Sequence, residues 1–213
     1  MNDTDRTVSP SNLHALLASR RSIRRYRSDP VPAEVVRRLV QAAAFAPSAH
    51  NRQPWRYVVI EDAAAKARLA KAMGERLAAD RTRDADDLEA IRLDVERSFA
   101  RITGAPIAIL ACLTLGEMDA YPDAKRREAE FLMAVQSTAM ATQNLLLAAH
   151  AEGLGACWMC APLFCPDTVR HALGLAADLQ PQGLITLGYP DAPGKIRQRK
   201  SLADILLVAE VDR

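Results

Sequence analysis

The stretch REAEFLMAVQSTAMATQNLLLAAH, from Arg127 to His150, decides the fold. Its apolar residues recur every three or four positions, which predicts one long α-helix. A helix that is apolar on nearly all sides must be buried, either deep in a domain or in a subunit interface, and we favour the interface. His150 ends the helix, where a cation would suit the helix dipole, and Gly153 fits a left-handed stop just beyond it. The apolar positions are Phe131, Val135, Ala139, Thr142, Leu146 and Ala149 on one stripe, with Met133, Met140 and Leu147 beside it.

The sequence before and after this helix contains further segments with helical and strand patterns. Residues 106–114 form an apolar run without alternation, which predicts a central strand covered on both faces. Leu88 to Phe99 has the spacing of an amphipathic helix within a longer, charged and alanine-rich segment. The remaining expected elements are a helix at 11–17, a helix from Pro32 that ends before Pro47, a strand at 55–60, a short helix from Pro166 and a strand at 183–189.

The composition indicates one globular domain over residues 1–213. Apolar residues make up 49% and charged residues 25%, which excludes a disordered chain. The formal charge of +2 and the 5% of aromatic residues argue against a nucleic-acid binder. No apolar run has membrane-spanning length and the first residues carry no secretory signal, so we expect a cytoplasmic protein without a membrane partner. Residues 1–10 are expected to be flexible, and residues 203–213 to form an edge strand or an arm on a partner subunit.

The four cysteines are too few for a disulfide scaffold in a chain of this length. Cys157 and Cys160 form a C-x-x-C motif, but a second pair and a histidine at ligand spacing are missing. The motif lies in an apolar stretch, where a free cysteine behaves as a small hydrophobic residue. We therefore expect packing rather than a redox or metal site, and we expect no metal.

Arginines dominate the segment RRSIRRY, residues 20–26. The chain lacks both the dinucleotide-binding glycine fingerprint and the P-loop motif, so any bound phosphate must be held by side chains. Arginine forks pair well with phosphate oxygens, and a serine hydroxyl can complete such a cradle. The same segment could also be a solvated basic turn or a nucleic-acid contact. A second basic group, Arg197, Arg199 and Lys200, lies near the end of the chain, where the segment Lys195 to Lys200 could close over a phosphate or could be a solvated tail.

The segment APSAHNRQPW, residues 46–55, places hydroxyl and amide side chains in one loop between a helix and a strand. Asn and Gln offer donors and acceptors together, so such a loop could bind the polar edge of a flat ring. It could equally be an ordinary proline-bounded loop that satisfies its own backbone.

Taken in order, RRSIRRY, APSAHNRQPWRYVVI, QNLLLAA, EGLGACW and the late arginines resemble the nitroreductase family of flavoproteins. The ordered set runs from Arg20 to Leu202 and so covers nearly the whole chain. The resemblance implies an α+β fold with a mainly antiparallel central sheet flanked by helices. It also implies an intertwined homodimer with FMN at the subunit interface, which would explain the long apolar helix.

The resemblance assigns the cofactor-binding residues position by position. Residues matching the family's phosphate and ribityl contacts are Arg20, Arg21, Ser22 and Arg24, with Arg197 and Arg199 matching its C-terminal phosphate contacts. Pro47, Ser48, Ala49 and Asn51 match the loop from the partner subunit that lines the flavin. Trp158 and Met159 fall where the family's backbone approaches the flavin ring. His50 departs from the small polar residues of other members and is our candidate for the substrate pocket.

The implied activity is hydride transfer from NAD(P)H to FMN, and then to a nitroaromatic, quinone or enone-type acceptor in the same pocket. The cofactor carries the difficult chemistry, so we nominate no catalytic side chain. The second half, with YPDAKRREAE (121–130) and GLGACW (153–158), is similar to the nitroreductase-like domain of deazaflavin coenzyme biosynthesis proteins. A free-standing FMN-dependent reductase of a dehydro deazaflavin precursor is therefore one alternative, and a flavin carrier or sensor without turnover is another.

Overall fold

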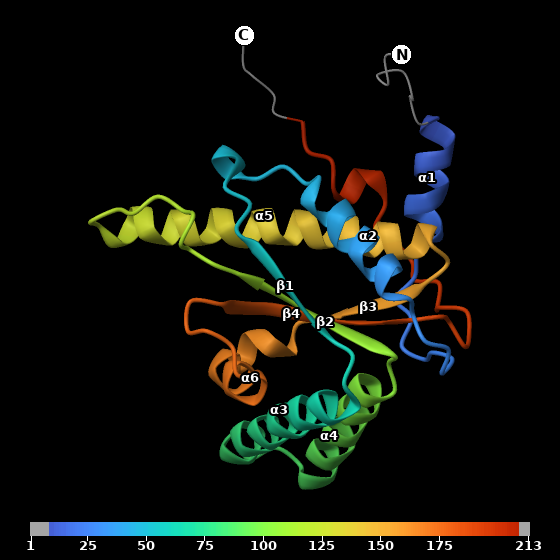
Figure 1. Cartoon of the computed structure of the whole chain (residues 1–213), viewed down its shortest axis with the longest axis vertical. Helices are drawn as coiled ribbons and strands as arrows, with labels where there is room; N and C mark the ends of the chain where they lie inside the picture. Colours follow the sequence, from blue (N-terminus) through green and yellow to red (C-terminus); the bar gives the residue numbers. More distant parts are fainter. Residues whose placement is uncertain (1–8, 209–213) are drawn as a thin grey trace.

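The computed structural model describes residues 9–208, which form a four-stranded sheet between two layers of helices (Figure 1). The strands are β1 (Trp55–Ile60), β2 (Ile107–Leu113), β3 (Gly155–Met159) and β4 (Gln180–Gly188), arranged in the order β1-β2-β4-β3. All neighbouring strands are antiparallel, which confirms the expected α+β class with an antiparallel sheet. Every residue of β2 is buried, as predicted for a central strand covered on both faces.

Six α-helices surround the sheet. They are α1 (Pro10–Ser19), α2 (Ala33–Ala44), α3 (Ala63–Arg83), α4 (Leu88–Thr103), α5 (Ala124–Ala151) and α6 (Pro166–Leu173). Short 3-10 turns lie at Ala49–Asn51, Ala161–Phe164 and Leu202–Asp204. In Figure 1, α2 and α5 cover one face of the sheet, and α3, α4 and α6 lie on the other. Within residues 9–208, no helix combines the length and hydropathy needed to cross a membrane.

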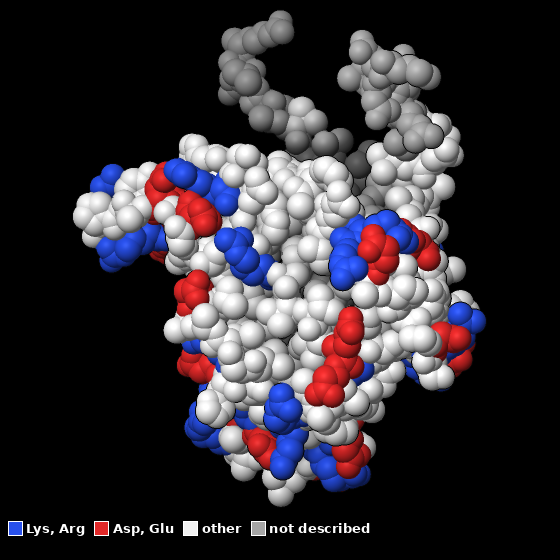
Figure 2. All heavy atoms as spheres, in the orientation of Figure 1, with Lys and Arg blue, Asp and Glu red and all other residues white. Residues whose placement is uncertain are grey.

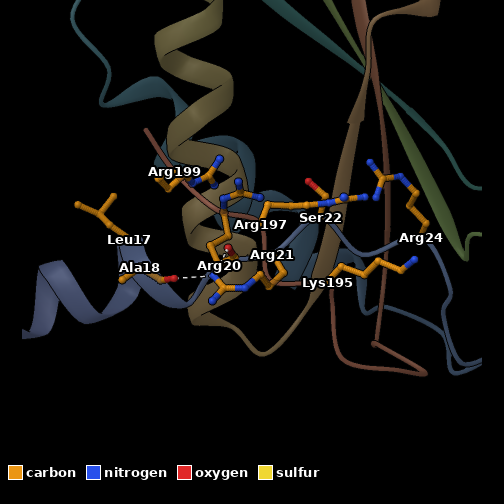
Figure 3. Close-up of a pocket in the computed structure, with 9 residues that line it drawn as sticks. All are labelled: Leu17, Ala18, Arg20, Arg21, Ser22, Arg24, Lys195, Arg197 and Arg199. Carbon is orange, nitrogen blue, oxygen red and sulfur yellow. Dashed lines mark hydrogen bonds between the residues drawn. The ribbon is translucent and has the colours of Figure 1, made fainter. Parts of the chain in front are cut away.

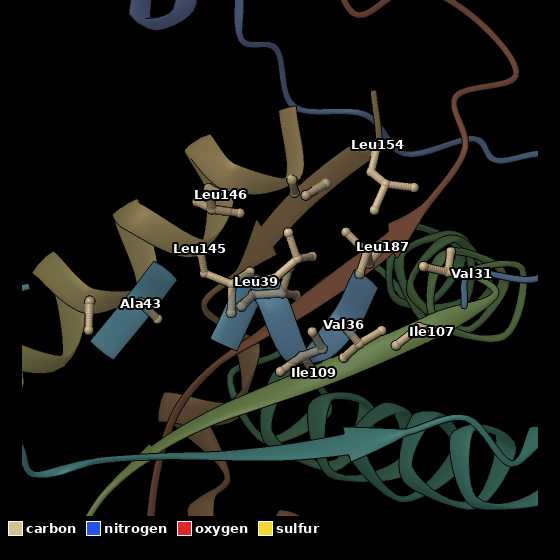
Figure 4. Packing of buried hydrophobic residues seen from close by; sticks show 14 of the residues in the cluster. Val31, Val36, Leu39, Ala43, Ile107, Ile109, Leu145, Leu146, Leu154 and Leu187 are labelled. Carbon is tan, nitrogen blue, oxygen red and sulfur yellow. The ribbon is translucent and has the colours of Figure 1, made fainter. Parts of the chain in front are cut away.

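Two hydrophobic cores follow from the period of two along the strands. On one face, Ile107 and Ile109 pack with Leu39 of α2 and Leu145 of α5, as Figure 4 shows. On the other face, Leu110 and its alternate neighbours pack with α3 and α6. The sheet is therefore fixed from both sides, and the site described below is built on its β3 edge.

The long helix α5 begins at Ala124, three residues earlier than expected, because the Asp123 carboxylate caps it by accepting the Arg126 N–H at 3.0 Å. Gly153 has a φ of 76°, which confirms the left-handed stop. Of the predicted stripe on α5, Thr142, Leu146 and Ala149 are buried within this chain, whereas Phe131 and Val135 are half-buried and Ala139 is exposed. Apolar Leu132 and Met140 stay 51% and 42% exposed. The first half of the stripe expected in a subunit interface is thus incompletely covered by its own chain, and the second half is buried within it.

Figure 2 shows how charged side chains are distributed over one face of the molecule. On the face in view, Lys and Arg lie beside Asp and Glu in small mixed groups, and the area between the projecting end of α5 and α2 is largely uncharged. Mixed charges and an uncharged central area suit contact with a second protein surface better than binding of a polyanion.

Two elements were not predicted. Helix α3 hides its pattern, because Lys66 and Gly74 occupy buried positions among its apolar residues. Strand β3 is only five residues long and lies at the edge of the sheet, where pairing with β4 defines it. Both are set by tertiary contacts and have weak local signals.

The ends of the chain are only partly described. The strand proposed within 203–213 is not formed at residues 205–208, which follow a 3-10 turn. Residues 209–213 and the first eight residues, on which the other expectations for the termini fall, lie outside the described residues. An arm on a partner subunit stays a prediction.

Candidate cofactor site

The arginine segment is anchored on the free edge of β3. Ser22 forms a parallel bridge with Ala156, and the Ile23 N–H donates to the Ala156 carbonyl at 3.0 Å. Ile23 is buried, and a Cβ on Gly155 would lie only 2.7 Å from it, so the close approach depends on glycine at that position. Because the segment is extended here, the neighbours of Ile23 point outward.

One cavity of about 360 Å³ collects the predicted phosphate-binding residues (Figure 3). Its charged and polar lining comes from two distant parts of the sequence, the segment after α1 and the loop after β4. Lys195 belongs to the late basic segment, residues 195–200, but the family resemblance does not assign it to the cofactor. The lining residues are Leu17, Ala18, Arg20, Arg21, Ser22, Arg24, Lys195, Arg197 and Arg199. We call this the basic cavity.

The late loop reaches the arginine segment at Gly194. A Cβ on this residue would lie 2.3 Å from the Arg21 Cβ and 2.9 Å from Ile23 Cδ1, so only glycine lets the two segments cross. The Arg21 guanidinium donates to the Ala18 carbonyl at 2.5 Å and to the Arg20 carbonyl at 2.9 Å, which ties it to the end of α1. Arg24 is set apart from Arg20 and Arg199 in Figure 3, on the far side of Ser22.

The cations of the basic cavity have no acidic partners within residues 9–208. No ion pair involves Arg20, Arg21, Arg24, Lys195, Arg197 or Arg199, whereas exposed arginines elsewhere, such as Arg38 and Arg92, pair with glutamates. A cavity with this lining has a strongly positive potential and is built to attract an anion.

His150, near the end of α5, contacts Ser19, the residue that precedes Arg20 of the basic cavity. Its Nε2 is hydrogen-bonded to Ser19 Oγ at 2.8 Å. Burial, followed by the charges of Arg20 and Arg21, lowers the pKa of His150 from its ordinary value of 6.5. The cation expected there from the helix dipole is therefore disfavoured, because local burial and two nearby arginines outweigh the dipole.

This shift predicts a pH dependence of stability. Below a pH of about 6.5 the unfolded chain gains a proton at His150 before the folded chain does, so the free energy of unfolding falls as the pH falls. We expect the Tm of the FMN-free protein to drop between about pH 7.5 and about pH 5.5, and to drop less in His150→Gln. Thermal unfolding at both pH values measures this, with His171→Gln as the control at an exposed histidine on α6. An equal drop in wild type and His150→Gln would contradict the assignment.

The loop of residues 47–53 is strained and held by serines. His50, Asn51 and Gln53 have φ angles of 48°, 53° and 49°, which cost about 1 to 2 kcal/mol each for residues with a Cβ. The Ser48 Oγ accepts the Gln53 N–H at 3.1 Å, and Ser137 Oγ on α5 accepts the Ala49 N–H at 3.4 Å. Strain of this kind persists only where surrounding contacts determine the conformation, and it concentrates at functional sites.

Ser48→Ala is expected to loosen this loop. Loss of one hydrogen bond costs about 1 kcal/mol, so amide hydrogen exchange at residues 48–53 should become about five times faster. Ser28→Ala, at an exposed serine outside the loop, serves as the control. Unchanged exchange in Ser48→Ala would show that Ser48 does not hold the loop.

Trp158 and Met159 lie half-buried at the end of β3, two and three residues beyond the bridge to Ser22. The Trp158 indole packs directly on Gly183 of β4, where a Cβ would lie 2.3 Å from Trp158 Cζ2. The Trp158 Nε1 donates to Cys160 Sγ at 3.0 Å.

The expectation that the C-x-x-C motif packs in the interior is confirmed for Cys157, which is 3% exposed. It is wrong for Cys160, which is exposed because it follows the last residue of β3. Burial raises the pKa of the Cys157 thiol. Among residues 9–208, no three His, Cys, Asp or Glu side chains gather as metal ligands.

Within one chain, the predicted cofactor residues form separate groups. The loop of residues 47–53 contacts α5 at Ser137, whereas Ser19, next to the basic cavity, contacts it at His150. These contacts are about 20 Å apart along the helix, at 1.5 Å rise per residue. His50 and Asn51 are exposed, and neither they nor Pro47, Ser48 and Ala49 line the basic cavity.

Comparisons with known proteins agree with this architecture. The family model described as Nitroreductase family matches residues 17–189. A protein from Thermus thermophilus named NADH dehydrogenase is 34% identical over 196 residues, covering 88% of this chain and 91% of its own length. A 5,6-dimethylbenzimidazole synthase from Rhodospirillum rubrum is 29% identical, covering 84% and 82%. A solved structure from Desulfovibrio desulfuricans, assigned as a nitroreductase in complex with FMN, has a TM-score of 0.71 and 29% identity, covering 97% of this chain and 100% of that one.

Proposed function

The chain belongs to the nitroreductase family, and from that premise we propose that it is an FMN-dependent oxidoreductase of the ping-pong type. It takes a hydride from NAD(P)H and passes electrons to a nitroaromatic, quinone or enone-type acceptor. The observation that carries the proposal is the basic cavity, in which six cations without acidic partners among residues 9–208 surround a space of about 360 Å³. The related structure in complex with FMN supports this identification of the anion.

The residues present fit FMN. A phosphate monoester carries about two negative charges at neutral pH and offers three acceptor oxygens. Arg20 and Arg197 are free to donate to it, and the Ser22 hydroxyl is exposed beside them. Arg21 holds carbonyl groups at the end of α1, so its role is to shape the cavity and to add charge.

The flavin ring would lie along the β3 edge, against the backbone of Trp158 and Met159. Bound FMN supplies the hydride-accepting chemistry. The arginines of the basic cavity would bind the phosphate, and the Trp158–Met159 segment would support the ring. The loop of Pro47, Ser48, Ala49 and Asn51 lies too far along α5 to serve the basic cavity of its own chain, so we assign it to the site of a partner in a homodimer. His50 of that loop would face the substrate.

The cofactor is tested first by the visible spectrum of the purified protein and by chromatography of the flavin released on heating. FMN in a ratio near one per chain supports the proposal. A protein that stays colourless after reconstitution with FMN would refute it.

The homodimer is tested by mixing two inactive variants. Arg20→Glu removes the phosphate contact, and Ala49→Trp blocks the flavin-lining loop. If each site takes its cavity from one chain and its loop from the other, a mixed dimer keeps one intact site, and an equal mixture recovers about a quarter of the wild-type activity. If both groups serve the same chain, no activity returns.

The acceptor is tested by steady-state kinetics with a nitroaromatic, a quinone and an enone. Parallel double-reciprocal lines indicate the ping-pong sequence. His50→Ala should change the relative rates of the three acceptors without changing FMN content. Bound FMN that no nicotinamide nucleotide reduces would instead indicate a carrier, or a reductase with a deazaflavin donor.

The four cysteines are free, which supports a reducing, cytoplasmic location.

A further inference from the structure

A smaller cavity of about 160 Å³ adjoins the basic cavity. The arginine segment contributes Ser22, Ile23, Arg24 and Arg25 to it, and the late loop contributes residues 192–195. Ser22, Arg24 and Lys195 line both cavities, whereas Arg25 lines only the smaller one. Ile23 and Gly194 line the smaller cavity and not the basic cavity, and they mark the point where the two segments cross.

The charge around the two cavities exceeds what one FMN phosphate can neutralise. Seven cations line them, and none forms an ion pair with residues 9–208: Arg20, Arg21, Arg24, Arg25, Lys195, Arg197 and Arg199. A phosphate monoester offsets about two of these charges. The remaining cations keep a positive potential that favours binding of a further anion beside the first.

We propose that the smaller cavity binds a phosphate of the reduced nicotinamide nucleotide while FMN occupies the basic cavity. The inference rests on the proposed function. Arg24 and Arg25 supply planar forks that match phosphate oxygens, and Lys195 adds a point charge. The cavity is several times the roughly 30 Å³ that one water molecule occupies in the liquid.

The shared lining explains why the two anions would bind side by side. Arg24 and Lys195 face both cavities, so each can balance the charge of FMN on one side and of the electron donor on the other. The phosphate could be part of the pyrophosphate common to NADH and NADPH, or the additional phosphate of NADPH. The chemistry of recognition is the same in both cases.

The test uses the FMN-saturated protein and inorganic pyrophosphate as the probe, with binding measured by calorimetry. Arg25→Ser removes a residue of the smaller cavity only. The matched control is Arg27→Ser, two positions along, where the arginine pairs with Asp29 and covers the Tyr189 ring. We expect one pyrophosphate per chain, about tenfold weaker binding in Arg25→Ser, and a change of less than about twofold in Arg27→Ser.

Kinetics identify the source of the phosphate. A higher KM for NADPH alone in Arg25→Ser indicates the additional phosphate, and a higher KM for both nucleotides indicates the pyrophosphate. Unchanged KM values for both nucleotides overturn the proposal. If pyrophosphate releases FMN, the two anions share a single site and the proposal is wrong. If Arg25→Ser and Arg27→Ser weaken pyrophosphate binding equally, the effect is a diffuse effect of charge, and the proposal is also wrong. Failure to bind FMN at all would refute the proposed function instead, so the two are distinguished.

Discussion

Arg197→Ser is expected to raise the Kd for FMN by roughly 10- to 150-fold and to leave the Kd for riboflavin nearly unchanged. Arg197 is exposed, lies in the loop after β4 and lines the basic cavity. One hydrogen bond between charged groups contributes about 1.5 to 3 kcal/mol, which corresponds to that range of affinity. Riboflavin lacks the phosphate, so it does not gain from the arginine.

Fluorescence titration of the flavin-free protein with each ligand measures both constants. Arg37→Ser is the matched control, since Arg37 is an exposed arginine on α2 that pairs with Glu34. Equal weakening of FMN and riboflavin would mean that Arg197 acts on the ring or on folding, and would contradict the phosphate assignment. Added salt should weaken FMN binding more than riboflavin binding, because exposed charges are screened.

Gly183→Ala is expected to lower the free energy of unfolding by about 1 to 3 kcal/mol and to weaken FMN and riboflavin alike. The new Cβ would lie 2.3 to 2.6 Å from three atoms of the Trp158 indole. Gly183 is buried in a central strand, so the backbone has little room to move and the indole must shift. Because Trp158 is in the segment proposed to support the flavin ring, the shift affects both ligands.

A double-mutant cycle tests this mechanism. Phenylalanine at position 158 lacks the outer part of the indole, so Gly183→Ala should cost less in a Trp158→Phe background than in the wild type. Denaturant unfolding of the four proteins gives the coupling energy. Additive losses would show that Gly183 and Trp158 act independently, and would remove the steric explanation.

The sequence predicted best the strands whose own residue pattern determines where they begin and end or how they are buried. The strand Trp55–Ile60 was predicted with its observed bounds, and the fully buried β2 followed from its unbroken apolar run. Helix α3 was missed because buried Lys66 interrupts its apolar pattern. The Lys66 Nζ donates to the Ala105 and Pro106 carbonyls at 2.6 and 2.8 Å, and no local sequence rule anticipates such a distant partner.

In the candidate site, too, some features could be predicted from the sequence and others depend on contacts between distant segments. The arginines near residue 20 and near residue 198 were assigned through the family resemblance, and the structure brings them to one cavity. Lys195 and Arg25 lie in the two candidate basic segments, but the resemblance does not assign them, and their place in the cavities depends on the crossing of those segments at Gly194. The position of the 47–53 loop, away from that cavity, also follows from tertiary structure, since α5 separates the two groups.

The most direct test of the account is anaerobic addition of NADH or NADPH to the FMN-saturated protein, with the visible flavin absorbance as the readout. We predict that the absorbance is lost on addition of at least one nucleotide and returns when an acceptor is added. FMN that remains oxidised with both nucleotides would contradict the assignment of this chain as an NAD(P)H-dependent oxidoreductase.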